Sequence, residues 1–451
     1  MLRAKHIQLL YTCCISVVLK YHCALINYAI FACIIIKHMK RYTKLCLIIC
    51  ITIMSGCSSV INKNDFARVE GMDIILPSGD KLDIKGTNLG HWLNPEGYMI
   101  GIHKNANSAS RINQAFCEMI GPEKTSEFWQ KFKDNYITQS DIAFIKSSGA
   151  NTIRIPFHYK LFTREDYMGL NDENEGFKRL DSLVSWCKKE QIYLILDMHD
   201  APGGQTGDNI DDSYGYPWLF ESPRCQDLFV DIWVRIAEHY KNETIILGYD
   251  LMNEPIATYF KDNEEELNKK LEPLYIKTTK AIREVDKNHI IILGGAQWNS
   301  IFSVFTDWEF DDNIMYSCHR YKGGTSKEAI QSFIDFRDRT NLPMWMGETG
   351  HNTYEWLHDF RITMEENNLG WTYWPYKKMG ESSFVNVKEP ANWNLIIQYA
   401  ESDRSWYALI RKNRPDAQLI NKAMDEYIEN IKFKNCIVES KYIEALGLEA
   451  E

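Results

Sequence analysis

The sequence predicts a (β/α)8 barrel, the TIM-barrel architecture of the α/β class, as a single catalytic domain with a short N-terminal hairpin. Short, continuously apolar runs such as TIRIPF, YLILDM and IIILGG recur along the chain. Strands with both faces covered by helices have this composition. Amphipathic stretches separate most of these runs, and eight such runs over roughly 320 residues favour a closed parallel barrel. A doubly wound open sheet is the alternative that the same alternation allows.

The expected elements begin with a hairpin at residues 73–86, where two alternating runs flank the turn cluster Pro77-Ser78-Gly79-Asp80. The barrel strands are expected at residues 83–88, 151–156, 193–198, 245–251, 289–294, 314–319, 343–347 and 370–375. Amphipathic helices are expected at residues 139–148, 177–189, 226–240, 264–285, 327–338 and 355–367. Residues 404–430 are expected to form a closing helical segment.

The N-terminus is predicted to be a targeting segment. Residues 37–44 form a basic stretch, and the apolar run LCLIICITIM at 45–54 has the length of a signal-peptide core. Ser55-Gly56-Cys57 follows and resembles a bacterial lipoprotein cleavage site, which would make Cys57 the lipidated first residue of the mature protein. An ordinary signal peptide, or a membrane anchor with an incidental cysteine, is the alternative. An apolar run of about ten residues is too short to span a bilayer by itself.

These features divide the chain into four parts. Residues 1–57 are expected to hold an N-terminal extension and the lipoprotein signal peptide, with Met39 as the natural start. Residues 1–38 are then a mis-assigned upstream extension or a second apolar segment. A linker at 58–70, the catalytic barrel at 71–432 and a peripheral tail at 433–451 are expected to follow. The expected location is the bacterial cell envelope, with the protein lipid-anchored in the periplasm or at the cell surface.

Charge and cysteine content bear on partners. Eight of the 51 basic residues precede Asp65, the first acidic residue, so the rest of the chain carries 43 basic and 61 acidic residues. An acidic body of this kind repels polyphosphate, and nucleic acid is not an expected partner. Seven of the 12 cysteines lie at or before position 57 and the others have no regular spacing, so neither a disulfide framework nor a zinc site is indicated. We expect a monomer with no cofactor, no metal and no membrane contact beyond the lipid anchor.

Two of the expected strands end on a glutamate. LMNEP at 251–255 presents Glu254, and MWMGETG at 344–350 presents Glu348. In a (β/α)8 barrel the active site lies at the carboxyl ends of the strands. Two carboxylates at that end, one protonated and one ionised, are the minimal machinery for cleaving a glycosidic bond.

Other polar or aromatic residues end the neighbouring strands. They are Arg154, His199, Asn253, His319, Tyr321 and Trp374. Taken singly, a strand-end Arg or His is more often a structural hydrogen-bonding group, and a Trp is more often part of a core. Their presence on so many strands of one barrel indicates a single shared site.

This constellation resembles glycoside hydrolase family 5, the cellulase family, over roughly residues 70–400. The matching features, in family order, are Arg154, His199, Asn253-Glu254-Pro255, His319-x-Tyr321, Glu348 and Trp374. Within the family the chain looks most similar to the exo-β-1,3-glucanase branch. GTNLGHWLNPEGYM (86–99) is similar to the GxNLGxWLxxExx opening of that branch, and HDAPGGQ (199–205) to its HxAPGxQ loop. The GETG segment and WPYKK at 374–378 depart from the branch pattern.

The resemblance implies a retaining β-glycosidase that hydrolyses β-glucans or β-gluco-oligosaccharides, with its glutamates about 5 Å apart. Glu254 is the implied general acid/base and Glu348 the implied nucleophile, held by Arg154 and Tyr321. The remaining residues are implied to bind substrate: His199, Asn253 at the sugar 2-hydroxyl, His319, Trp374 as a stacking face, and Glu96 on the loop after the first strand. A surface carboxylate is the alternative interpretation of Glu96.

Two other functions stay open at this point. One is a non-catalytic glycan-binding lipoprotein, which the presence of both glutamates disfavours. The other is the same chemistry on another β-glycoside, such as a mannan or a glycolipid. Linkage specificity and exo or endo action depend on loop geometry, and residues 201–224 are long enough to close one end of a cleft.

Overall fold

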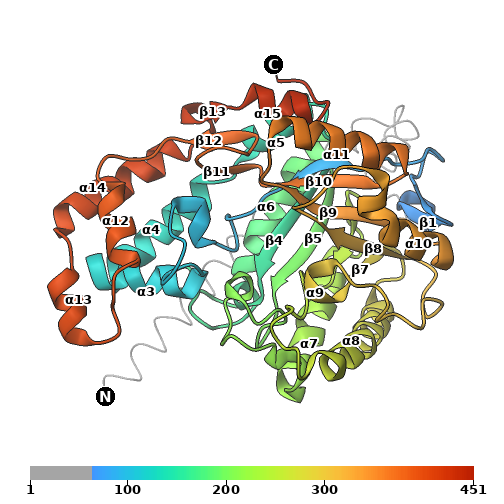
Figure 1. Ribbon diagram of the computed structural model, residues 1–451, viewed down its shortest axis with the longest axis horizontal. Coiled ribbons are helices and arrows are strands. Elements are labelled where there is room, and N and C mark those ends of the chain that lie inside the picture. The colour runs from blue at the N-terminus through green and yellow to red at the C-terminus, as the bar shows by residue number, and fades with distance from the viewer. Residues whose placement is uncertain (1–62, 451) are drawn as a thin grey trace, which may run out of the picture. The chain divides into compact units, whose positions relative to one another are not determined.

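Eight parallel strands close into a barrel in the computed structural model, which describes residues 63–450 (Figure 1). In barrel order these strands are β3 (Lys85–Asn88), β4 (Thr152–His158), β5 (Tyr193–Asp200), β6 (Ile246–Asp250), β7 (Ile290–Gly294), β8 (Ile314–His319), β9 (Met344–Gly350) and β10 (Gly370–Trp374). β10 pairs with β3 and completes the ring. The predicted (β/α)8 barrel is therefore confirmed, and each strand overlaps the range expected from the sequence. The open doubly wound sheet is excluded.

The expected helices lie on the outside of this ring (Figure 1). They are α5 (Gln139–Ser147), α6 (Glu175–Glu190), α7 (Pro223–Tyr240), α8 (Glu264–Val285), α10 (Gln331–Thr340) and α11 (Tyr354–Glu366). Local sequence sets where they begin. Thr138 and Asp141 form a capping box at the start of α5. Ser222 accepts a hydrogen bond from the Cys225 N–H at the start of α7, which also has Pro223 in its first turn.

The connection from β7 to β8 differs from the others. It contains only the four-residue α9 (Ala296–Asn299), in which Gln297, Trp298 and Asn299 have φ values of 47°, 56° and 57°. Left-handed conformations at consecutive residues stop helix propagation. The sequence likewise shows no amphipathic stretch here.

A hairpin precedes the barrel, as predicted. β1 (Arg68–Glu70) and β2 (Asp73–Ile75) pair antiparallel across Gly71, whose φ of 59° suits a tight turn. Its ladder lies upstream of the expected range of 73–86. The expected turn at 77–80 also forms, but only an isolated bridge between Ile75 and Lys81 follows it.

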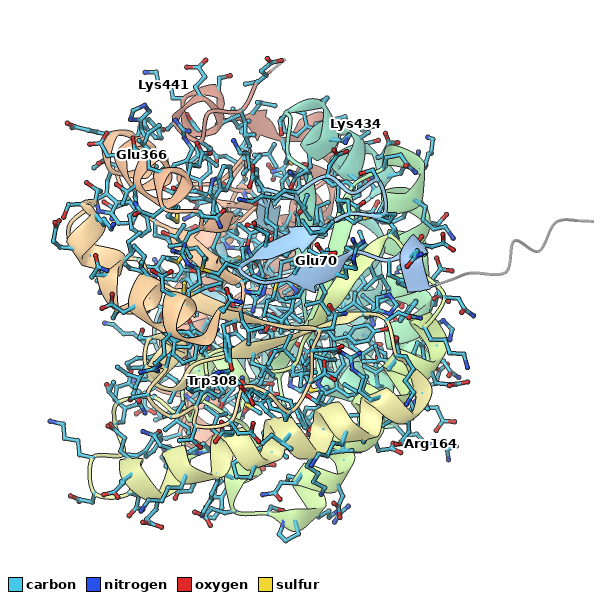
Figure 2. The ribbon with its side chains drawn as sticks, turned by 90° about the vertical axis from the view of Figure 1, so that its right-hand side faces the viewer. Glu70, Arg164, Trp308, Glu366, Lys434 and Lys441 are labelled. Atoms are coloured by element: carbon cyan, nitrogen blue, oxygen red, sulfur yellow. The ribbon has the colours of Figure 1, made fainter. Side chains whose placement is uncertain are left out.

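The hairpin region covers one end of the barrel interior. Ile74, Leu82 and Ile84 belong to a buried cluster with residues of the barrel strands, among them Leu247 and Trp345. Figure 2 looks onto this face, with Glu70 of the hairpin in front of the barrel. The opposite end, where the strands terminate, is thus the end that remains accessible for chemistry.

A helical extension lies beside the barrel (Figure 1). It consists of α3 (Ala109–Ile120), α4 (Pro122–Asn135), α12 (Trp393–Ala400), α13 (Tyr407–Asn413) and α14 (Ala417–Asn430). Helices α13 and α14 match the expected closing segment, whereas α3, α4 and α12 were not expected. Aromatic packing joins distant parts of the chain, because Tyr427 stacks on Trp393 at 4.6 Å and on Phe132 at 6.4 Å between ring centroids.

The last residues complete the same unit. β11 (Lys377–Met379), β12 (Val385–Val387) and β13 (Ile437–Val438) form a small sheet, and α15 (Ser440–Ala445) packs against α11. Tyr442 and Ile443 are fully buried. The expectation of a peripheral tail after residue 432 therefore needs correction, because these apolar side chains fill a gap beside the barrel.

Short 3-10 turns complete the list of elements: Lys63–Asp65, Gly97–Ile100, Tyr159–Phe162, Asn209–Asp211, Trp218–Phe220, Lys327–Ile330 and Phe433–Asn435. The signal-peptide prediction, Met39 and Cys57 fall on residues 1–62, outside the described residues. Across residues 63–450, no helix has the length and apolar character required to cross a membrane.

Candidate active site

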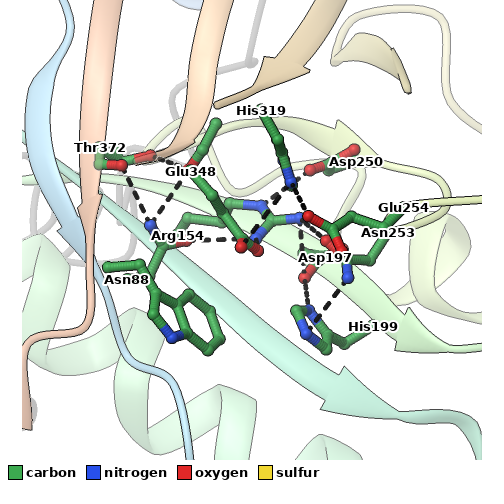
Figure 3. Close-up of polar contacts among 12 residues, drawn as sticks. Asn88, Arg154, Asp197, His199, Asp250, Asn253, Glu254, His319, Glu348 and Thr372 are labelled. Atoms are coloured by element: carbon green, nitrogen blue, oxygen red, sulfur yellow. Dashed lines mark hydrogen bonds and ion pairs between the residues drawn. The ribbon is translucent and has the colours of Figure 1, made fainter. Parts of the chain in front are cut away.

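The polar strand ends meet around one cavity of about 470 Å³. Seven of the nine residues predicted for the site line it: Glu96, His199, Asn253, Glu254, Tyr321, Glu348 and Trp374. The other two, Arg154 and His319, are buried and contact the two glutamates (Figure 3). The structure therefore brings all nine predicted residues into a single site.

Arg154 is the buried centre of the hydrogen-bond network (Figure 3). Its Nη1 donates to Glu348 Oε1 at 2.6 Å, its Nε donates to Asp250 Oδ2 at 2.8 Å, and its Nη2 lies 3.0 Å from Asp197 Oδ2. Burial by itself disfavours the guanidinium cation, but the three carboxylates outweigh it and raise the pKa of Arg154. One cation thus anchors carboxylates from three strands.

Asp197 and Asp250 lie beneath the cavity and are fully buried. Burial raises the pKa of each carboxyl to about 7, although Arg154 opposes the shift. The sequence analysis did not select either residue as a site residue. The available signal was a charge within an otherwise apolar strand, YLILDM in one case and IILGYD in the other.

Glu348 is held at both carboxylate oxygens. Arg154 donates to Oε1, and the Tyr321 hydroxyl donates to Oε2 at 2.7 Å. The side chain is 4% exposed and projects from β9. A cationic donor and a neutral donor together fix the carboxylate geometrically and compensate its negative charge.

Glu254 occupies a different environment, just after β6. Its φ is +44°, in the left-handed region that non-glycine residues seldom adopt. Thr206 Oγ1 donates to the Glu254 carbonyl at 2.7 Å, and the Ile256 N–H donates to the Gln205 carbonyl at 2.8 Å. A conformation of this kind costs about 1–3 kcal/mol and persists where neighbouring contacts enforce it. The loop after β5 thus holds the Glu254 backbone in place.

The Glu254 carboxyl contacts His319 and no cationic side chain. His319 Nδ1 lies 2.8 Å from Glu254 Oε1, and burial lowers the pKa of His319 to about 3, so the imidazole is neutral. Burial, reinforced by the charge of Asp208, raises the pKa of Glu254 to about 7, against the opposing influence of His199 and Arg154. Glu254 therefore retains its proton well above the usual range of a carboxyl group.

His199 connects the floor of the site to the wall. Its Nδ1 lies 2.7 Å from Asp197 Oδ2, while its Nε2 lies 3.2 Å from Asn253 Nδ2. An amide nitrogen can only donate, so Nε2 accepts and Nδ1 carries the proton that is donated to Asp197. The Asn253 Oδ1 accepts from Arg154 at 2.9 Å, which fixes the orientation of the amide.

Trp374 and Glu96 border the cavity on the side of Glu348. The indole of Trp374 stacks on His199 with ring centroids 5.4 Å apart, and its Nε1 donates to the Tyr98 hydroxyl. Glu96 is 4% exposed, so the surface-carboxylate interpretation is wrong. Burial, followed by the charges of Glu348 and Glu254, raises the pKa of Glu96 well above its usual value. Its Oε1 has no hydrogen-bond partner among residues 63–450 and is free to accept one from a ligand.

Several residues of the site were not predicted. Asn88 accepts from Arg154 at 3.2 Å, and Tyr98 and Ile210 line the cavity. Asn88 could have been inferred as one more polar strand end. No pattern in the sequence marks Ile210, because its place in the site depends on the path of a long loop.

Metal-type donors converge once among the described residues. Glu254, His319 and Glu348 each offer an atom, and these three atoms lie within 4.8 Å of one another. The Glu348 oxygens already accept from Arg154 and Tyr321, and the Arg154 cation disfavours a second positive charge there. The donor set is better suited to hold a proton between two carboxylates.

Comparison with known proteins identifies the class. The family model described as Cellulase (glycosyl hydrolase family 5) matches residues 113–380. The chain therefore belongs to glycosyl hydrolase family 5, and it is a glycoside hydrolase.

Individual relatives agree with this membership. A protein named Beta-xylosidase from Phanerodontia chrysosporium is 30% identical over 362 residues, which cover 71% of this chain and 73% of that protein. Endoglucanase C from Acetivibrio thermocellus is 27% identical over 330 residues, covering 60% and 92% of the two chains. A crystal structure of an endogalactoceramidase superposes with a TM-score of 0.52 at 18% identity, over 69% of this chain and 75% of that one, and shares the fold.

Proposed function

We propose that the protein is a retaining β-glycosidase that hydrolyses β-glucans or β-gluco-oligosaccharides by double displacement in polysaccharide catabolism. The observation that carries the proposal is the spacing of the two glutamates, since an oxygen of Glu254 and an oxygen of Glu348 lie within 4.8 Å. Inverting enzymes separate their carboxyl groups by about 6.5–9.5 Å to admit a water molecule, and retaining enzymes by about 5–5.5 Å.

In the first step Glu348 attacks the anomeric carbon and forms a glycosyl ester. The bond from that carbon to the leaving oxygen breaks, and the oxygen takes the proton of Glu254. The raised pKa of Glu254, about 7, supports this role because the proton is present near neutral pH. Arg154 and Tyr321 orient Glu348 for the attack through their contacts with its two oxygens.

In the second step a water molecule attacks the same carbon. The Glu254 carboxylate removes a proton from this water, and Glu348 departs as a carboxylate. Asn253, fixed by Arg154 and His199, is placed to hold the 2-hydroxyl of the sugar, a contact that strengthens in an oxocarbenium-like transition state. Two inversions at one carbon give net retention.

The finer specificity is proposed from sequence resemblance to the exo-β-1,3-glucanase branch. Glu96, which belongs to the branch-like opening segment, lies at the cavity with an unpartnered oxygen. β-1,3-Glucans are therefore the first substrates to test. Aryl β-xylosides and β-mannosides belong in the same panel, because a relative named Beta-xylosidase is 30% identical.

The test is hydrolysis of this panel by the wild type and by Glu348→Ala, with Glu366→Ala as the matched control, since Glu366 is an exposed residue of α11 (Figure 2). We expect activity that Glu348→Ala abolishes and Glu366→Ala preserves. The first-formed product, observed by proton NMR, should be the β anomer. Formation of the α anomer would contradict double displacement, and glycan binding without any turnover would favour a binding protein.

We also propose that the protein is a lipid-anchored monomer of the bacterial cell envelope. Support comes from the basic stretch, apolar run and Ser55-Gly56-Cys57 of the sequence. A Cys57→Ala variant should appear in the soluble fraction. Membrane retention of that variant equal to wild type would refute lipidation at Cys57.

A further inference from the structure

The loop after β5, residues 201–222, separates two cavities. Ile210 lines the catalytic cavity together with Glu96. The next residues, Asp211 to Tyr214, line a second cavity of about 280 Å³ together with Ser108 and Ser110. The loop therefore stands as a wall at one end of the catalytic cavity, with open space behind it.

Asp212 fastens this wall to the opposite side of the cavity. Its two carboxylate oxygens accept from the Ser110 N–H at 3.0 and 3.1 Å, and one of them accepts from the Ser110 hydroxyl at 2.5 Å. The Asp212 side chain is 3% exposed and lies 3.6 Å from His158 Nε2. Asn94 Nδ2 adds a second contact between the same segments, donating to the Ile210 carbonyl at 3.5 Å.

The wall is rigid on its own side as well. Asp211 accepts from the backbone N–H groups of Thr206 and Gly207 at 2.8 and 2.7 Å, and from Ser213. A loop that is fixed internally and latched at its tip does not open without losing several hydrogen bonds. The Asp212–Ser110 contact is the part of this arrangement that joins it to the segment following β3.

The wall stands at the end that receives the transferred sugar. It borders Glu96, whose pKa responds more to Glu348 than to Glu254, so Glu96 lies on the nucleophile's side. The leaving group departs on the other side, next to the proton of Glu254. There Tyr259 donates to Asp208 at 2.9 Å, is 61% exposed, and meets Trp298 with ring centroids 5.3 Å apart. Exposed aromatic rings on that rim offer stacking faces to sugars beyond the cleaved bond.

We infer that the Asp212–Ser110 latch closes the glycone end of the cavity and restricts the enzyme to the non-reducing ends of its substrates. This inference rests on the proposed function. Opening the latch would join the two cavities into a longer groove that admits internal segments of a chain. Asp212 and Ser110 are thus positioning residues that set the mode of cleavage without contacting the reacting atoms.

The test compares the full chain with Asp212→Gly, because glycine accepts the φ of +44° at this position while removing the carboxylate. Asn341→Gly is the matched control, since Asn341 is exposed and has a similar φ of +52° at the end of α10. Two substrates report the mode: an aryl β-oligosaccharide blocked at its non-reducing end, and a long soluble β-glucan followed by viscosity and reducing ends. The unblocked aryl oligosaccharide reports the chemistry alone.

We expect the wild type and Asn341→Gly to hydrolyse the unblocked substrate and to cleave the blocked one at least a hundredfold more slowly. In Asp212→Gly the ratio of blocked to unblocked cleavage should rise at least tenfold, with a steeper fall of viscosity per bond broken. Wild-type cleavage of blocked and unblocked substrates at similar rates would overturn the inference while leaving the proposed function intact. Failure to hydrolyse any β-glycoside would overturn the proposed function and this inference with it. If Asp212→Gly does not fold, the wild-type blocked-substrate ratio decides.

Discussion

The two glutamates of the site have the same side chain and contrasting surroundings. Glu348 lies within a strand and accepts from the Arg154 cation at 2.6 Å and from Tyr321 at 2.7 Å. Glu254 lies in a left-handed turn, and its carboxyl meets the neutral imidazole of His319 at 2.8 Å. Its pKa is raised to about 7, chiefly by burial. The comparison teaches that the neighbours, rather than the residue type, divide a proposed proton donor from a proposed nucleophile.

The strongest way to break this comparison is Glu348→Gln. An amide keeps the shape but does not attack the anomeric carbon, so kcat/KM should fall on the order of 10⁴-fold or more. Steady-state kinetics on an aryl β-glycoside measure the loss, with Glu366→Gln as the surface control. A loss below about tenfold would exclude Glu348 as the nucleophile.

Glu254→Gln should have a smaller effect that depends on the leaving group. Loss of a general acid costs about 10²–10⁴-fold for a substrate whose leaving group needs a proton. An aryl glycoside with a strongly acidic phenol needs no proton and should lose much less in its first step. Kinetics on both substrates measure the difference. Equal losses on the two would show that Glu254 does not donate the proton.

Tyr321→Phe sharpens the account of the Glu348 side. It removes the hydroxyl that donates to Glu348 Oε2. A hydrogen bond to a charged group contributes about 1.5–3 kcal/mol, so kcat/KM should fall about 10- to 150-fold. Tyr316→Phe is the matched control, because the buried Tyr316 hydroxyl has no partner among the described residues. Similar activity losses in both variants would point to a general effect on packing.

The pH dependence tests the Glu254 side directly. A proton donor with a pKa of about 7 is competent below pH 7, and kcat/KM should fall tenfold for each pH unit above it. Profiles between pH 4 and 9 on a poor leaving group measure this limb. Asp197 and Asp250 also have pKa values of about 7, so the control is Glu254→Gln with an activated substrate. The limb should vanish there, and its persistence would assign it to the aspartates.

The smallest expected effect concerns the strained turn. Thr206→Val keeps the shape of the side chain and removes the hydroxyl that donates to the Glu254 carbonyl. Loss of one neutral hydrogen bond, at about 0.5–1.5 kcal/mol, should lower kcat/KM about two- to tenfold. Thr278→Val, which removes a bond within α8, is the control. An unchanged kcat/KM would mean that other contacts suffice to hold Glu254.

Sequence patterns predicted the barrel well and the additions to it less well. Alternating apolar strands and amphipathic helices follow from burial on both faces of a parallel sheet, so each barrel strand was found. Helices α3 and α4 were missed because no buried strand frames them, and they pack against α14, about 300 positions further along the chain. The same reason explains the buried Tyr442 in a segment that looked peripheral.

By itself, the sequence determined that a set of polar side chains gathers at one end of the barrel, because all parallel strands end there. Only the tertiary structure decided what each of them does. The raised pKa of Glu254 comes from burial and from charges brought close in space. The wall beside the cavity depends on a contact between Asp212 and Ser110, which are 102 positions apart. Electrostatic fields and loop contacts act through space, so one-dimensional spacing does not encode them.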